Sequence, residues 1–127
     1  MKDLFEKYKW LFNYSNTLIE STYHYKDEWD AYRLMLFDKM YGMFGEDNNG
    51  NLILTLKGLP EENIVMIDSY SSVMLGYYMN KEHWYSIKLE EKEFSKDELQ
   101  NFIKQSYELI KIKLPKKTRD LINEKEL

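Results

Sequence analysis

A change in hydrophobic period along the chain constrains its fold more than any other feature. Over residues 2–21, apolar residues such as Leu4, Tyr8 and Leu11 recur at three- and four-residue steps, the spacing of one helix face. From Trp29 onward, apolar and other residues alternate with a period of two, which is typical of strands with one buried face. The chain therefore predicts an N-terminal helix followed by antiparallel strands, an α+β arrangement.

Three consecutive strands are expected between Trp29 and residue 57. A tight turn at Asp38-Lys39 separates the first two strands, and Asn49-Gly50 separates the second from the third. Asn-Gly tolerates the positive φ angles of a hairpin turn. Residues 21–30, which are polar and aromatic, are expected to form a loop leading into the first strand.

The second half of the chain predicts more helix than strand. Pro60 with acidic neighbours predicts the start of a short helix over residues 60–70. Pro is favoured in the first turn of a helix, and acidic side chains there are stabilised by the positive end of the helix dipole. This helix is expected to bury Ile64, Val65 and Ile67. An irregular loop over residues 71–80 and one more strand over 84–89 follow.

Two helices are expected to close the chain. Ser95 and Glu98 form the Ser-x-x-Glu pattern of a capping box ahead of an apolar-periodic run that ends at Pro115. A final short helix is expected over residues 116–125. Residues 1–127 thus form one predicted domain, α+β, with an antiparallel sheet packed against N- and C-terminal helices.

Composition excludes several classes of function. The chain has no Cys and only two His, so disulfides, thiol nucleophiles and zinc clusters are excluded, and a reducing compartment is expected. No apolar run reaches the ~20 residues that span a bilayer. We expect a cytoplasmic protein without membrane association, cofactor, metal or enzymatic activity, because no metal-ligand spacing or phosphate-binding Gly-rich loop is present.

Two groups of residues are candidates for nucleic-acid binding. The first is a loop in which Lys81 could meet a phosphate and Trp84 could stack on a base. Alternatively, Asn80 and His83 fix an irregular loop and Trp84 fills the edge of the core. The second is a run of five basic residues without an acid, Lys111, Lys113, Lys116, Lys117 and Arg119.

That basic run has two interpretations. Its charges could bind a phosphate backbone, or they could lie in solvent near a helix C-terminus, where cations are favoured. The chain as a whole has a net charge of −4, whereas proteins that bind nucleic acid mainly through phosphates carry basic surfaces. Any nucleic-acid contact must therefore be local.

Residues 76–84 give the chain a specific resemblance. Their sequence is similar to Gly-Tyr-x-x-Asn-Lys-x-His-Trp of the MmcQ/YjbR family, and residues 105–117 resemble its Ser-Tyr-x-Leu…Leu-Pro-Lys-Lys ending. Lys39-Met40-Tyr41-Gly42 is a weaker third match. The resemblance implies a compact α+β fold of the CyaY-like or double-wing kind. It also implies the DNA-binding role often attached to the family name.

Two functions follow from these observations. The first is a small cytoplasmic binding protein of the MmcQ/YjbR kind that contacts DNA through the two groups of residues. The alternative is a protein–protein interaction module that uses an aromatic surface around Tyr77, Tyr78 and Trp84, since aromatic residues are favoured at the centre of interfaces. An enzyme with a small-molecule pocket near His83 is the least supported option.

Overall fold

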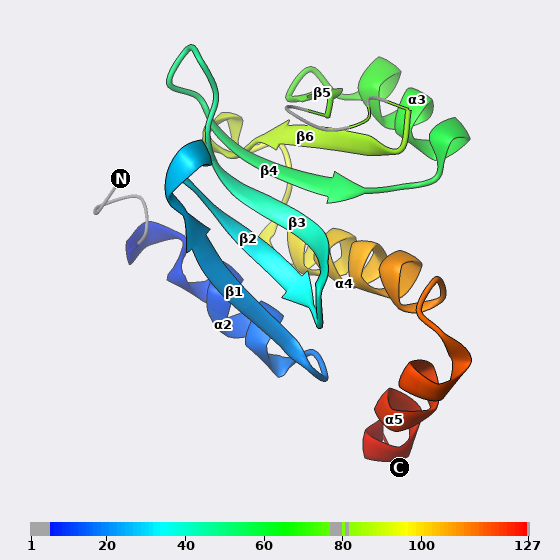
Figure 1. Ribbon diagram of the computed structural model, residues 1–127. Coiled ribbons are helices and arrows are strands. Elements are labelled where there is room, and N and C mark those ends of the chain that lie inside the picture. Colours follow the sequence, from blue (N-terminus) through cyan, green and yellow to red (C-terminus); the bar gives the residue numbers. More distant parts are fainter. Residues whose placement is uncertain (1–5, 77–79, 81, 127) are drawn as a thin grey trace.

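The centre of the fold is a six-stranded sheet in the order β1-β2-β3-β4-β6-β5, with every neighbouring pair antiparallel. The computed structural model describes residues 6–76, 80 and 82–126, and Figure 1 shows the strands fanned from β1 to β5. The strands are β1 (Ser21–Lys26), β2 (Ala31–Leu36), β3 (Lys39–Glu46), β4 (Leu52–Lys57), β5 (Val73–Leu75) and β6 (Trp84–Lys88).

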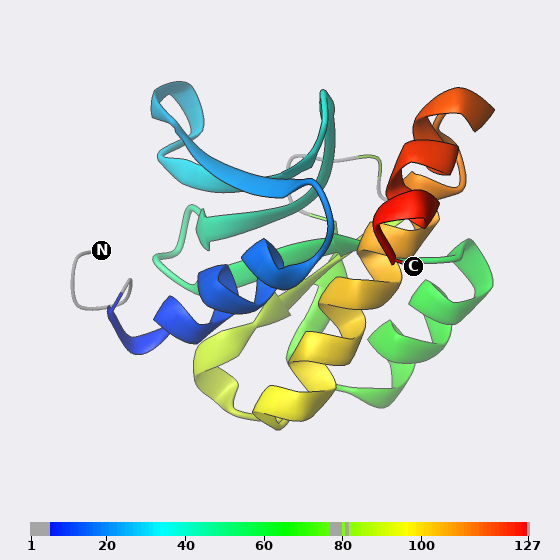
Figure 2. The ribbon, with the colours of Figure 1, turned by 90° about the horizontal axis from the view of Figure 1, so that it is seen from below.

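Helices from both ends of the chain pack on this sheet. In Figure 2, α2 and α3 lie on either side of α4, and α5 follows at the C-terminal end of α4. The predicted class, α+β with an antiparallel sheet and terminal helices, is confirmed. The helices are α2 (Lys9–Thr17), α3 (Pro60–Ser69), α4 (Lys96–Lys111) and α5 (Lys116–Glu126), with short 3-10 turns η1 (Asp27–Trp29) and η2 (Leu89–Glu91).

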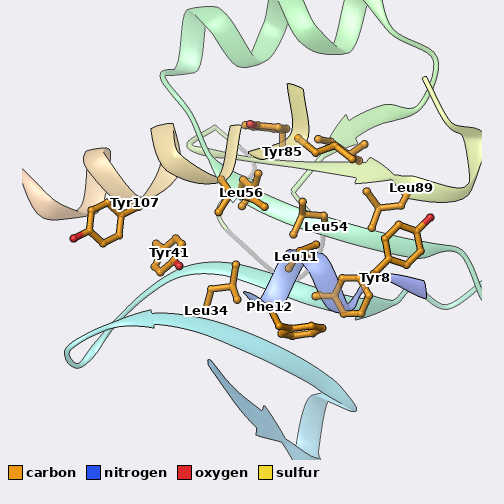
Figure 3. Packing of buried hydrophobic residues seen from close by; sticks show 14 of the residues in the cluster. Tyr8, Leu11, Phe12, Leu34, Tyr41, Leu54, Leu56, Tyr85, Leu89 and Tyr107 are labelled. Carbon is orange, nitrogen blue, oxygen red and sulfur yellow. The ribbon is translucent and has the colours of Figure 1, made fainter. Parts of the chain in front are cut away.

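The hydrophobic core joins the two terminal helical regions through the sheet. Leu11 and Phe12 of α2 are buried against strand residues. The rings of Tyr41 and Tyr107 pack edge to face, with 5.6 Å between their centres (Figure 3).

α4 begins with the predicted capping box: Glu98 N donates to Ser95 Oγ at 3.1 Å, and Ser95 N donates to Glu98 Oε1 at 2.9 Å. The apolar periods in the sequence thus predicted both α2 and α4.

The two predicted hairpin turns are present, one of them shifted by a residue. Phe37 and Asp38 form the turn between β2 and β3, and Phe37 has a φ of 55°. Gly50 has a φ of 79° in the turn before β4, as Asn-Gly predicts. Asp47 fixes this second turn by accepting hydrogen bonds from the backbone N–H groups of Asn49 and Asn51, each at 2.9 Å.

Two segments expected to be loops contain strands. β1 occupies Ser21–Lys26 and β5 occupies Val73–Leu75, and these are the two edges of the sheet. An edge strand pairs on one side only, and β1 exposes much of its surface, so its sequence lacks the strict alternation of a half-buried strand. The N-terminal helix consequently ends at Thr17, before the predicted residue 21.

The inner face of α3 also differs from the prediction. Ile64 and Val65 are 60% and 62% exposed, whereas Asn63 is buried and Met66 and Ile67 are partly buried against the core. Four consecutive apolar residues cannot all face one side of a helix. The prediction that Ile64 and Val65 are buried is therefore wrong, and α3 has apolar side chains on its outer surface.

Candidate binding groove

The loop before β6 is organised by Asn80. Its Oδ1 accepts a hydrogen bond from Glu82 N at 2.9 Å, and its carbonyl accepts from the N–H groups of His83 and Trp84 at 3.2 and 3.1 Å. Lys81, and also Tyr77 and Tyr78 of the alternative aromatic surface, lie outside the described residues. Asn80 is thus placed to fix the turn into β6.

Trp84 is 8% exposed, which leaves little of its ring for stacking on a base. Gly76 packs directly against it: Gly76 N donates to Trp84 O at 3.0 Å, and a Cβ at Gly76 would lie 2.6 Å from Trp84 Cβ. This burial agrees with the interpretation that Trp84 fills the edge of the core.

The basic segment 111–119 is not one continuous charged surface. Lys111 is buried and its Nζ lies 3.1 Å from Glu126 Oε1 and 4.0 Å from Glu108 Oε2. Lys116 forms an exposed ion pair with Asp120 at 2.9 Å.

The remaining cations of the segment differ from one another. Lys113 and Lys117 are exposed and form no ion pair with a described residue. Arg119 has a buried Nε that donates to no described residue. The cations free to meet a ligand are therefore fewer than the sequence implied.

A groove lies between α3 and α4. It has a volume of about 870 Å³ and its floor lies where β4 ends and β6 begins; Figure 2 shows the two helices beside each other. The groove is lined by Lys57, Gly58, Leu59, Glu61, Glu62, Asn63, Val65, Met66, Tyr85, Asn101, Phe102, Lys104, Gln105, Glu108, Leu109 and Ile112.

The floor of the groove is built around Gly58 and Asn63. Asn63 Nδ2 donates to Gly58 O at 3.3 Å and to Glu82 O at 3.2 Å, which ties the start of α3 to the loop before β6. Gly58 N donates to His83 O at 3.0 Å. The buried ring of Tyr85 lies beside Gly58, and burial, reinforced by the charge of Glu62, raises the pKa of its hydroxyl.

Lys57 stands at the end of the groove floor. Its backbone N–H donates to Ser106 Oγ at 2.8 Å, which fixes the last residue of β4 against α4. Its ammonium lies 5.9 Å from the centre of the Trp84 ring. Burial first, and then the neighbouring charge of Lys113, lowers the pKa of Lys57 to about 8. Lys57, which was not predicted from the sequence, therefore lies near one residue of each predicted group, Trp84 and Lys113.

A signal for the groove was present in the sequence. Residues 64–67 are Ile-Val-Met-Ile, so a helix that covers the sheet with two of them must expose the other two. What the sequence does not contain is the distance between α3 and α4, which depends on how both pack on the sheet.

Comparison with known proteins identifies the family of this chain. A model of the YjbR family matches residues 17–109, well over half of the chain. The chain belongs to the YjbR family. The matched range includes α3 and most of α4, and therefore nearly all of the groove. The basic residues from Lys111 to Arg119 lie beyond the matched range.

Two solved structures have the YjbR-family fold of this chain. A Deinococcus radiodurans protein described by a DUF419 domain is 23% identical, with a TM-score of 0.74, covering 89% of this chain and 85% of that one. A Pseudomonas syringae protein is 20% identical, with a TM-score of 0.66, covering 80% of this chain and 96% of that one. No curated protein matches the sequence. At these identities the likeness concerns the fold.

Two further features are absent from the described part of this YjbR protein. No described helix combines the length and apolar character needed to cross a membrane. Among the described residues, no group of three His, Cys, Asp or Glu side chains is arranged to hold a metal ion.

Proposed function

We propose that this YjbR protein is a binding protein that holds an apolar organic ligand in the groove. The observation that carries the proposal is a concave, largely apolar surface whose rim residues Leu59, Val65 and Ile112 are all substantially exposed. Exposed apolar side chains gathered at one place mark binding surfaces in water-exposed proteins. Ligand pockets usually have volumes of roughly 300–1,000 Å³, a range that includes this groove.

The composition of the lining supports binding of a small molecule. Its apolar side chains are Leu59, Val65, Met66, Phe102, Leu109 and Ile112. Five lining residues are charged: Lys57 and Lys104 are positive, and Glu61, Glu62 and Glu108 are negative. An apolar lining with a few convergent polar groups is the usual composition of a small-molecule site.

The experiment uses a neutral fluorescent probe, N-phenylnaphthylamine, which brightens when it leaves water. Wild-type protein should increase its fluorescence with saturation. Val65→Glu places a carboxylate in the groove and should weaken binding roughly tenfold, because a charge desolvated beside an apolar ligand costs on the order of 1–3 kcal/mol.

Ile64→Glu is the matched control, since Ile64 neighbours Val65 on α3, is equally exposed and does not line the groove. We expect it to bind the probe within about twofold of wild type. Equal loss in both variants would place the probe elsewhere on α3. Failure of the wild-type protein to bind would contradict the proposal.

DNA binding is the second candidate, and the exposed, unpaired Lys113 and Lys117 support it. With Lys116 they offer three cations around Pro115, so the logarithm of affinity should fall with the logarithm of salt with a slope of about −2.7, taking ~0.9 per phosphate. Anisotropy of labelled duplex DNA at low and near-physiological salt tests this. Lys116→Glu/Lys117→Glu should abolish binding, and Lys39→Glu, an exposed change at the β2–β3 turn, should not.

A protein partner remains the third candidate. Its predicted surface included Tyr77 and Tyr78, which lie outside the described residues, and Trp84, which is buried. If DNA does not bind at low salt and the groove rejects the apolar probe, a partner that covers Leu59, Val65 and Ile112 becomes the working proposal.

A further inference from the structure

Two lysines from distant parts of the chain meet at one end of the groove. Lys57 is the last residue of β4 and lines the groove, whereas Lys113 follows the last turn of α4. Ile112, the residue before Lys113, also lines the groove, and the charge of Lys113 acts on Lys57. Neither lysine forms an ion pair with any carboxylate of the described residues. Two adjacent cations repel each other, and an anion between them removes that repulsion.

The carboxylates of the groove do not neutralise this pair. Glu108 is directed at Lys111, with 4.0 Å between Oε2 and Nζ. Glu61 and Glu62 lie in the first turn of α3, where the helix N-terminus favours negative charge. The charge that acts on Lys57 is that of Lys113. The groove therefore combines an apolar body with an uncompensated cationic end.

We propose that the ligand of the groove is an amphiphilic carboxylate, whose apolar chain lies between α3 and α4 and whose carboxylate binds between Lys57 and Lys113. The inference rests on the proposed function and specifies the ligand class. A polyanion such as nucleic acid fits this end of the protein less well, because Glu61, Glu62 and Glu108 line the same groove and repel further negative charge.

The test compares probes that share an alkyl chain and differ in the head group: decanoate, decanol and decyltrimethylammonium, with acetate as the head group alone. Their affinities are measured by displacement of N-phenylnaphthylamine and by calorimetry at neutral pH. Decanoate should bind roughly tenfold more tightly than decanol, since a hydrogen bond to a charged group is stronger than one between neutral groups. Decyltrimethylammonium should bind most weakly, and acetate should not bind measurably.

Variants of the lysine pair assign the effect to its residues. Lys57→Met should lower decanoate affinity to that of decanol and leave decanol binding unchanged, whereas Lys57→Arg should retain the preference. Lys39→Met is the control, because Lys39 is an exposed lysine at the β2–β3 turn and does not line the groove; it should change the decanoate preference by no more than about twofold.

A folding control accompanies Lys57→Met. Removing a half-buried cation that repels Lys113 should leave the melting temperature unchanged or raise it by a few degrees, so lost binding would not reflect unfolding. If the variant melts at a lower temperature, Lys113→Met, at an exposed position, provides the same test.

The possible outcomes separate the two proposals. Equal affinities for decanoate and decanol would overturn the carboxylate assignment and leave the groove as an apolar site. Acetate binding as tightly as decanoate would show an isolated anion site and would also overturn it. If neither the probe nor any alkyl ligand binds, the proposed function itself fails.

Discussion

At the scale of single residues, position 58 requires glycine because neighbouring atoms leave no room for a side chain, and not because its backbone angle is unusual. A Cβ at this position would lie 2.1 Å from Asn63 Oδ1 and 3.1 Å from the ring of Tyr85. Gly58→Ala should therefore lower the free energy of unfolding by about 1–3 kcal/mol, because Asn63 must move from the carbonyls it binds. Urea denaturation measures the change.

Gly50→Ala is a useful comparison for that experiment. Its Cβ would meet nothing within 4 Å, but its φ of 79° disfavours a side chain, so we expect a smaller loss, roughly 1 kcal/mol. A Gly58→Ala variant as stable as wild type would show that Asn63 does not hold the groove floor as described.

The lowered pKa of Lys57 predicts a pH dependence of stability. In the unfolded chain a lysine titrates near 10.4, whereas in the folded protein Lys57 titrates at about 8. The unfolded state therefore binds more protons between these values, and the free energy of unfolding contributed by Lys57 rises as pH increases through that window. Below about pH 8 the penalty is fully present.

Lys57→Met isolates this contribution. The variant should exceed wild type in stability by about 1 kcal/mol at neutral pH, well below the full shift because much of the ammonium is in water. The difference should shrink between about pH 8 and pH 10, and urea denaturation of both proteins across this range measures it. A constant difference across the range would contradict the assignment.

At the scale of the elements, α4 depends on its first residues. Ser95 and Glu98 satisfy backbone N–H groups that would otherwise lack partners. Ser95→Ala should lower the free energy of unfolding by about 1 kcal/mol, measured by chemical denaturation. Lys104→Ala, an exposed change in the same helix, should stay within about 0.5 kcal/mol of wild type; an equal effect of both would contradict a specific role for the cap.

The predictability of each element depended on its neighbours. α4, β3 and β4 show clear periods in the sequence because each packs one face or both against the core. β1 and β5 were missed because an edge strand has a partner on one side only, so its burial, and hence its sequence pattern, is incomplete. The exposed outer face of α3 was missed because its four successive apolar residues fit several rotations of the helix about its axis.

The site was less predictable than the fold for the same physical reason. Lys57, Val65 and Ile112 come from three elements, and only tertiary packing brings them to one groove. The sequence motif around Asn80 was found, yet several of its described contacts organise a turn. The cluster of basic residues was also predicted, but two of its lysines form ion pairs: Lys111 with Glu126 and Lys116 with Asp120.

At the scale of the whole molecule, the buried residues form one hydrophobic cluster, whose members range along the chain from Tyr8 to Ile122. Ile122, in the last helix, is completely buried, whereas its neighbour Leu121 is 51% exposed. Ile122→Ala should lower the free energy of unfolding by about 2–4 kcal/mol, and Leu121→Ala should change it by less than about 1 kcal/mol.

The same urea titration tests whether the core is one cooperative unit. Tryptophan fluorescence and far-ultraviolet circular dichroism should report coincident transitions for wild type and Ile122→Ala. Separate transitions in the variant would mean that α5 unfolds independently of the sheet.

The strand order also determines the sequence in which the chain can fold. Short turns connect β1 through β4, so each of these pairings closes a small loop, whereas pairing of β4 with β6 must enclose residues 58–83. Longer loops lose more chain entropy on closure and form more slowly. The groove needs α3, β6 and α4 together, so its walls assemble after the four-stranded meander. In pulse-labelled hydrogen exchange, amides of β2 and β3 should gain protection before those of β6.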